Sequence, residues 1–114
     1  MIKIYHNTRC SKSRSACSIL AEKGIPVEII EYLKTPPSQA ELKNLLKMLG
    51  MKAEDIVRKN EPLFKEKYQG KSFSEDEWIR ILSENPVLIQ RPIIVKGNKA
   101  VIGRSEEQIQ EILE

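Results

Sequence analysis

Residues 2–32 read IKIYHNTRCSKSRSACSILAEKGIPVEIIEY, and this stretch decides the fold. Apolar side chains alternate at its start, as in a strand, and a polar run then leads into apolar residues at helical spacing. Gly24 follows and is expected to end the helix, because the position after a helix favours a residue that adopts the left-handed backbone conformation. A second apolar run at residues 27–32 completes a strand–helix–strand unit. Such a unit predicts two parallel strands joined by a right-handed connection.

Helices are predicted for the middle third of the chain and strands for the last third. Ser38 and Ser74 each precede a glutamate by three residues, which is the capping-box pattern of a helix start. Gly97 and Asn98 form a two-residue hairpin loop between apolar runs, and a last helix closes the chain. The expected fold is α/β, with a βαβ unit, a helical insertion, a ββ hairpin and a C-terminal helix around a four-stranded mixed sheet. This is the element order of a thioredoxin-like domain.

Length and composition restrict the class of protein. The chain has 114 residues, which at ~150 residues per domain predicts a single domain over residues 1–114. With 40% hydrophobic and 31% charged residues it is expected to fold, and its apolar runs are far too short to cross a membrane. Its start alternates apolar and polar residues, so no secretory signal is expected, and the net charge of +3 is too mild to indicate nucleic-acid binding. We expect a cytoplasmic monomer that binds neither nucleic acid nor membrane.

The charges are unevenly distributed along the sequence. Residues 1–21 and residues 85–105 contain no Asp or Glu, so all 16 carboxylates lie elsewhere. Two acid-free segments that met in space would form a positive basin for a small anion. The alternative is that this distribution arose by chance.

Cys10 falls where the first predicted strand gives way to the first predicted helix. Unpaired backbone N–H groups and the helix dipole favour an anion there, so the thiol is expected to have a pKa below the free value of ~8.5. Arg9, Lys12 and Arg14 add positive charge nearby. The alternative is a buried, inert cysteine, but the neighbours of Cys10 are nearly all polar.

Cys17 lies on the apolar stripe of the same helix and is expected to pack in the core. Seven helical steps separate it from Cys10 by ~10 Å, more than the ~7 Å that a disulfide tolerates. Ser13 stands where a Cys-x-x-Cys motif would have its second cysteine. Any redox cycle at Cys10 therefore needs a thiol from outside the chain. Two cysteines and one histidine predict no metal site.

Three arginines lie at the ends of predicted elements: Arg58, Arg91 and Arg104. Pro92 follows one of them and is expected to begin a strand, because proline cannot donate to a sheet ladder. Each arginine taken singly is compatible with an ordinary solvated surface residue. Guanidinium groups that converged on a thiolate would suit a tetrahedral oxyanion, since they are planar bidentate donors.

Five separated stretches resemble the glutaredoxin-coupled arsenate reductase (ArsC) family: residues 4–14, 32–38, 57–61, 85–95 and 100–104. The resemblance covers essentially the whole chain. It implies a thioredoxin-like fold and a cis peptide bond before Pro92. Thr8, Ser11 and Ser105 depart from the proline, glycine and proline that the family often has at these positions.

The resemblance also implies roles for individual residues. Cys10 is the nucleophile that attacks arsenate and forms a thiol–arsenate ester, and His6 helps to keep it as a thiolate. Ser13 and Pro92 support the site. Glutathione as co-substrate and then glutaredoxin supply the electrons, with no bound cofactor, as in enzymes of arsenical resistance. The oxyanion and the arsenite-like intermediate are held by Arg58, Arg91 and Arg104.

Two other functions remain open at this stage. One is a glutathione-dependent thiol transferase that uses Cys10 on a disulfide. The other is a non-catalytic, Spx-like regulator that binds RNA polymerase. A site with several arginines suits a dianion better than a neutral disulfide.

Overall fold

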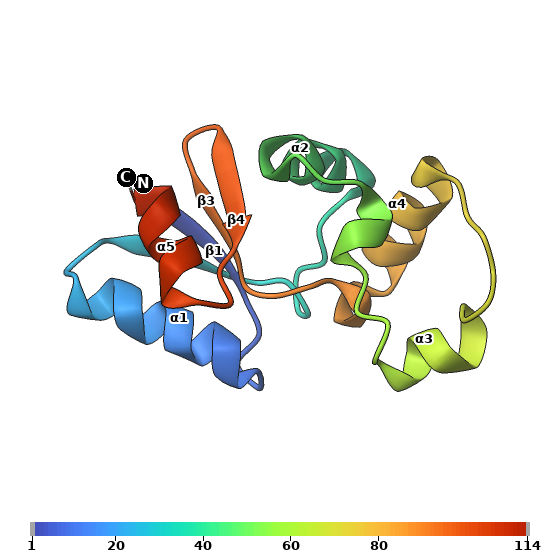
Figure 1. The fold of residues 1–114 in the computed structure, drawn as a ribbon, viewed down its shortest axis with the longest axis horizontal. Helices are drawn as coiled ribbons and strands as arrows, with labels where there is room; N and C mark the ends of the chain where they lie inside the picture. Colours follow the sequence, from blue (N-terminus) through green and yellow to red (C-terminus); the bar gives the residue numbers. More distant parts are fainter. Residues whose placement is uncertain (1, 114) are drawn as a thin grey trace. The chain divides into compact units, whose positions relative to one another are not determined.

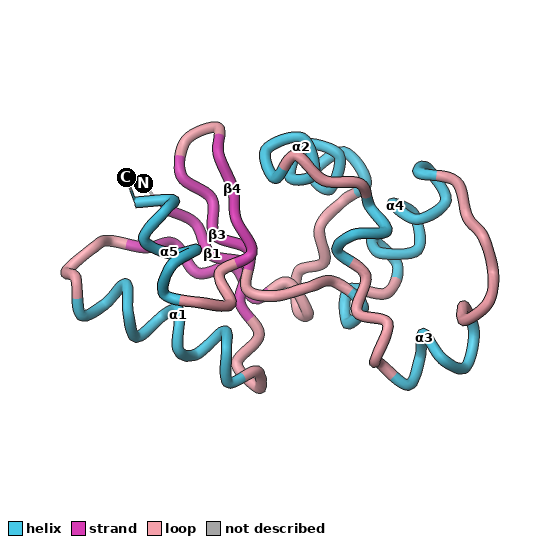
Figure 2. The backbone as a smooth tube through the Cα atoms, in the orientation of Figure 1, coloured by secondary structure: helices cyan, strands magenta, loops and turns pink. Residues whose placement is uncertain are grey.

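The computed structural model describes residues 2–113, and the chain divides into two compact units. The sheet unit comprises residues 1–35 and 91–114, and the helical unit comprises residues 36–90. Figure 2 shows that the described strands all lie in the sheet unit. The expectation of a single domain over residues 1–114 stays a prediction.

The sheet unit has the predicted α/β topology (Figure 1). Its strands are ordered β2-β1-β3-β4; β1 pairs with β2 in parallel and with β3 antiparallel, and β3 pairs with β4 antiparallel. The four-stranded mixed sheet and its thioredoxin-like element order are therefore confirmed. The elements are β1 (Ile2–His6), α1 (Ser11–Glu22), β2 (Val27–Glu31), β3 (Ile93–Lys96), β4 (Lys99–Ile102) and α5 (Glu106–Leu113).

Two glycines fix turns of this unit through positive φ angles. Gly24 has φ 69° directly after the C-cap of α1, where the chain turns towards β2. Gly97 has φ 63° in the two-residue loop between β3 and β4. Only glycine adopts this left-handed region without steric cost, so both turns follow the sequence prediction.

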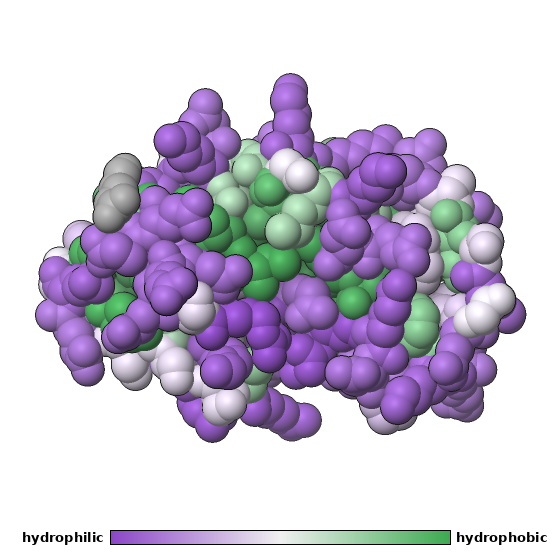
Figure 3. Space-filling view, viewed as in Figure 1, coloured by the Kyte–Doolittle hydropathy of each residue, from purple (hydrophilic) through white to green (hydrophobic). Residues whose placement is uncertain are grey.

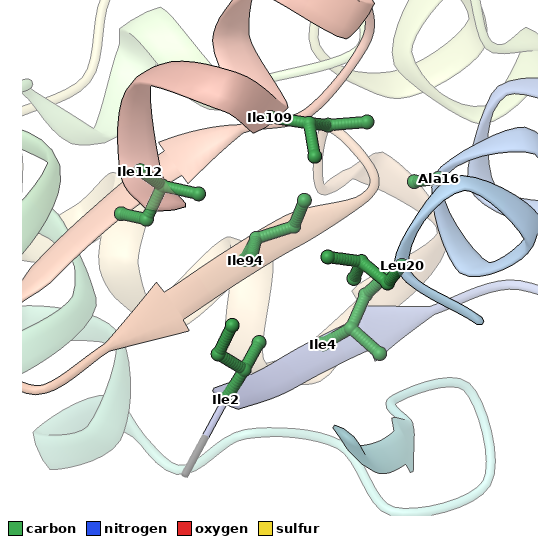
Figure 4. Packing of buried hydrophobic residues seen from close by; sticks show 7 residues of the cluster. All are labelled: Ile2, Ile4, Ala16, Leu20, Ile94, Ile109 and Ile112. Atoms are coloured by element: carbon green, nitrogen blue, oxygen red, sulfur yellow. The ribbon is translucent and has the colours of Figure 1, made fainter. Parts of the chain in front are cut away.

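Helices α1 and α5 pack on one face of the sheet around an aliphatic core (Figure 4). Side chains two apart in a strand share a face, and side chains four apart share one side of a helix. Each fully buried aliphatic side chain contributes about 1.5–3 kcal/mol. This packing fixes the start of α1, where Cys10 lies. The core residues are Ile2, Ile4, Ala16, Leu20, Ile94, Ile109 and Ile112.

The helical unit confirms the predicted insertion. The capping box at Ser74 forms in full, because its side chain accepts from the Glu77 N–H and the Glu77 carboxylate accepts from the Ser74 N–H. The ring of Trp78 stacks on Phe64, with ring centroids 6.3 Å apart. The elements are α2 (Gln39–Leu49), the 3-10 helix η1 (Ala53–Ile56), α3 (Pro62–Lys67), α4 (Glu75–Glu84) and the 3-10 helix η2 (Pro86–Leu88).

Figure 3 shows hydrophilic residues over much of the visible face. Among residues 2–113, no helix has the length and apolar character needed to span a membrane. In the described part of the chain, three large hydrophobic side chains remain exposed, Ile29, Leu33 and Met51, which is ordinary for a folded protein.

Candidate functional site

Cys10 is the N-cap residue of α1. Its backbone is extended, with φ −95° and ψ 122°, and its carbonyl accepts from the Arg14 N–H at 3.0 Å. Its own N–H donates to the Asn7 carbonyl at 3.0 Å, which holds the loop between β1 and the helix. The side chain is half-buried and carries a free thiol. Cys10 therefore lies at the positive end of the helix, as predicted, and within reach of solvent.

The pKa of Cys10 lies below its ordinary value. Burial alone would raise it, but hydrogen bonds from the Ser13 N–H, the Arg91 guanidinium and the Lys12 N–H outweigh that effect. The positive charge of Arg91 lowers the pKa further. Donors aimed at the sulfur favour the thiolate, which is the nucleophilic form of cysteine.

We expect the rate of Cys10 alkylation by iodoacetamide to have a midpoint below pH ~8.5. The sign follows from the lowered pKa, since reactivity is lost only when the pH falls through that pKa and the thiolate becomes protonated. The measurement uses the Cys17→Ser variant, so that only the Cys10 thiol reacts with iodoacetamide. A midpoint at or above the free-thiol value contradicts the electrostatic account of the site.

Arg91 and Arg104 are brought to the same place. Arg91 precedes the cis peptide bond to Pro92, which the resemblance implied, and interacts with Cys10 and Tyr32. Burial lowers the pKa of Arg91, but these partners outweigh it and the pKa is raised, so the guanidinium stays charged. The Nη1 of Arg104 donates to the Arg91 carbonyl at 3.3 Å. Cys10 of the first acid-free segment and Arg91 of the second thus lie next to each other.

His6 contacts Ser13 and Cys17. Its Nδ1 is hydrogen-bonded to the Ser13 Oγ and lies 3.6 Å from the Cys17 Sγ. Burial lowers the pKa of His6; Glu31 partly offsets this, and Arg14 lowers the pKa further. A neutral imidazole supplies no charge to hold a thiolate. The direct support of Cys10 by His6 therefore stays a prediction, and the contact that the structure shows runs through Ser13.

Ser13 connects this network to the nucleophile. It is fully buried, and its Oγ also accepts from the Asn7 N–H at 3.0 Å. Its own backbone N–H faces the sulfur of Cys10. Ser13 therefore holds the first turn of α1 against the end of β1.

Two contacts near the site were not predicted. Tyr32 is buried and interacts with Arg91. Cys17 contacts His6, and its partial burial raises its pKa. The sequence signal for Tyr32 is its place just after β2, the parallel neighbour of β1. For Cys17 no signal exists, because its contact crosses from a helix to a strand end.

Arg58 lies in the helical unit. Its Nε donates to the Glu61 carboxylate at 3.2 Å, and its backbone N–H donates to the Leu88 carbonyl. Its assignment to the oxyanion site stays a prediction. Among residues 2–113, no three His, Cys, Asp or Glu side chains form a cluster that could hold a metal ion.

Comparisons with known proteins agree on one family. Residues 5–112 match the ArsC family. The chain is 46% identical to the uncharacterized protein YfgD of Escherichia coli, over 98% of this chain and 96% of that one. It is 41% identical to an arsenate reductase of Neisseria meningitidis, over 98% of this chain and 97% of the relative. The solved arsenate reductase of Vibrio cholerae superposes with a TM-score of 0.92 at 42% identity, covering 97% of this chain and 96% of the other.

Proposed function

Because this chain belongs to the ArsC family, we propose that it reduces arsenate to arsenite with the Cys10 thiolate as nucleophile. The observation that carries the proposal is the Arg91 guanidinium on the Cys10 sulfur at the start of α1. Arsenate is a tetrahedral dianion, and a preorganised set of cationic and N–H donors stabilises it and the charge that develops on its oxygens. Arsenate reductases at about 40% identity support arsenate as the substrate.

In the first step, the Cys10 sulfur attacks arsenic. An S–As bond forms and an As–O bond breaks, so the Cys10 thiol and arsenic acid give a thiol–arsenate ester and one water molecule. Because Cys10 reacts as the thiolate, its proton has already passed to solvent, and the leaving hydroxyl takes a proton from solvent to become that water molecule. Arsenic gains no electrons in this step. Arg91 and Arg104 hold the remaining oxygens. The Arg91 guanidinium lies beside Cys10, and the Arg104 guanidinium lies beside the Arg91 carbonyl.

In the second step, an external thiol attacks the Cys10 sulfur. A disulfide bond forms between the two sulfurs, the S–As bond breaks and its electron pair stays on arsenic. The thiol proton goes to an oxygen of arsenic, so the products are a mixed disulfide at Cys10 and arsenous acid. A second thiol then releases Cys10 and leaves joined to the first as a disulfide. We propose glutathione and glutaredoxin for these two thiols.

Cys17 is unsuited to the role of the attacking thiol. It lies seven residues further along the sequence, in the same helix that Cys10 caps, and its sulfur contacts the His6 ring. A helical separation of seven residues is too long for a disulfide. The thiol that reacts at Cys10 therefore comes from another molecule.

The test is arsenate-dependent oxidation of NADPH by the purified protein with glutathione, glutaredoxin and glutathione reductase. We expect turnover that saturates with arsenate and stops when glutathione is omitted. Turnover of hydroxyethyl disulfide with no response to arsenate contradicts the proposal and indicates a thiol transferase. No turnover of either substrate, together with binding to RNA polymerase, indicates a regulator.

A further inference from the structure

A groove of about 500 Å³ lies beside the loop that leads to Cys10. We call it the loop groove. It belongs wholly to the sheet unit, and its volume is in the range of small-molecule sites. One of its lining residues, Asn7, is joined to the backbone of Cys10, because its carbonyl accepts from the Cys10 N–H at 3.0 Å. The lining residues are His6, Asn7, Thr8, Arg9, Glu31, Leu33 and Lys34.

Two polar side chains that line the loop groove are more than nine-tenths buried. His6 is 8% exposed and Asn7 is 6% exposed. The Asn7 Oδ1 accepts from the Arg9 N–H at 2.9 Å, and the His6 Nδ1 is engaged by Ser13. The His6 Nε2 and the Asn7 Nδ2 have no hydrogen-bond partner within residues 2–113. Neither atom is among the buried polar side-chain atoms that lack a partner, so both are open to solvent and to a ligand.

The hydrogen bonds around Ser13 are compatible with a His6 ring that carries its proton on Nε2. In that arrangement, the Ser13 Oγ accepts from the Asn7 N–H and donates its own proton to the His6 Nδ1. The Nδ1 is then an acceptor, and the neutral ring carries its proton on Nε2. His6 therefore offers an N–H donor to the loop groove, and Asn7 offers its amide N–H donors beside it.

The charges on the groove rim favour an anion. Lys34 forms an ion pair with Glu31 at 3.5 Å, so these two charges offset each other. Arg9 is exposed and remains as the net positive charge of the lining. One cation with two neutral donors suits a monoanionic carboxylate, whereas the arginine pair at Cys10 suits a dianion. Leu33, 40% exposed, adds an apolar contact for an organic ligand.

We propose that the loop groove is a subsite for a carboxylate of the external thiol that reacts at Cys10. This inference rests on the proposed function, since it concerns the second step of that reaction. A thiol whose carboxylate binds at His6, Asn7 and Arg9 is held beside the loop that ends at Cys10. There it attacks the Cys10 sulfur and the S–As bond breaks, with the electron pair left on arsenic.

The binding test needs no arsenate. Isotope-labelled protein is titrated with S-methylglutathione, which carries the carboxylates but no thiol, and with its diethyl ester, which lacks them. We expect amide shifts at residues 6–9 and 31–34 with the acid and none there with the ester. The Arg9→Gln variant should bind the acid about tenfold more weakly, the value of one charge-assisted hydrogen bond. Lys99→Gln, the same charge change at an exposed position on β4, serves as the matched control and should bind as the wild type does.

A kinetic measurement complements the binding test. In the arsenate assay, the wild type should have a lower KM for glutathione than for its diethyl ester, and Arg9→Gln should bring the ratio of the two values towards one. Binding at the groove without arsenate reduction supports the subsite and contradicts the proposed function. Arsenate reduction with equal KM values and no groove shifts overturns the subsite. Groove shifts with inorganic phosphate and none with S-methylglutathione also overturn it, since they indicate an oxyanion site.

Discussion

The Cys10→Ser variant is expected to lose arsenate-dependent turnover by at least about 10³-fold. A serine hydroxyl stays protonated at neutral pH, and the donors that lower the pKa of the Cys10 thiol cannot make it an anion. An oxygen–arsenic ester, if formed, offers no sulfur for an external thiol to attack. The electron pair therefore has no route to arsenic. The measurement is the coupled NADPH assay with thermal unfolding as a check that the variant folds.

The matched control is Cys17→Ser, which should keep more than half of the wild-type rate. Cys17 has a pKa raised by burial, and its place near His6 can be taken by a hydroxyl. Equal loss in both variants contradicts the external-thiol scheme, because it makes Cys17 a resolving thiol. Full activity in Cys10→Ser contradicts the assignment of the nucleophile.

Local sequence signals were sufficient for the scaffold of this site. The alternation of Ile2 and Ile4 and the helical spacing of Ala16 and Leu20 predict a strand and a helix that share a core, and the structure has both. The place of Cys10 at the helix start follows from the same pattern. These predictions succeed because the spacing of apolar residues and the capping of a helix depend on residues that are close in the sequence.

The contacts between distant segments could not be predicted in the same way. Sequence spacing does not show that Ser13 bonds the end of β1, or that Tyr32 meets Arg91. Such contacts depend on strand register and on the turn of the loop before Cys10. His6 illustrates the limit: the resemblance implied that it helps to keep Cys10 a thiolate, the structure shows its Nδ1 on Ser13, and the implied role stays a prediction.

The Arg91→Gln variant is expected to lower kcat/KM for arsenate by about 10²–10³-fold, as removal of one preorganised donor does in other enzymes. It should also move the alkylation midpoint of Cys10 to higher pH. Both effects have one cause, because the Arg91 guanidinium donates to the sulfur and places positive charge beside it. A glutamine keeps a neutral donor and loses the charge.

Arg91→Lys separates charge from geometry. A lysine keeps the positive charge but lacks the planar guanidinium with its paired donors. We therefore expect the pH midpoint of Cys10 alkylation to return most of the way to the wild-type value, while kcat/KM for arsenate stays at least about tenfold below wild type. Arg80→Gln, an exposed arginine of α4, is the control for a lost charge and should match the wild type. An unchanged Cys10 midpoint in Arg91→Gln contradicts the contact on which the site depends. A shifted midpoint with unchanged kcat/KM limits Arg91 to activating the thiol and leaves Arg104 and the helix start to hold the oxyanion.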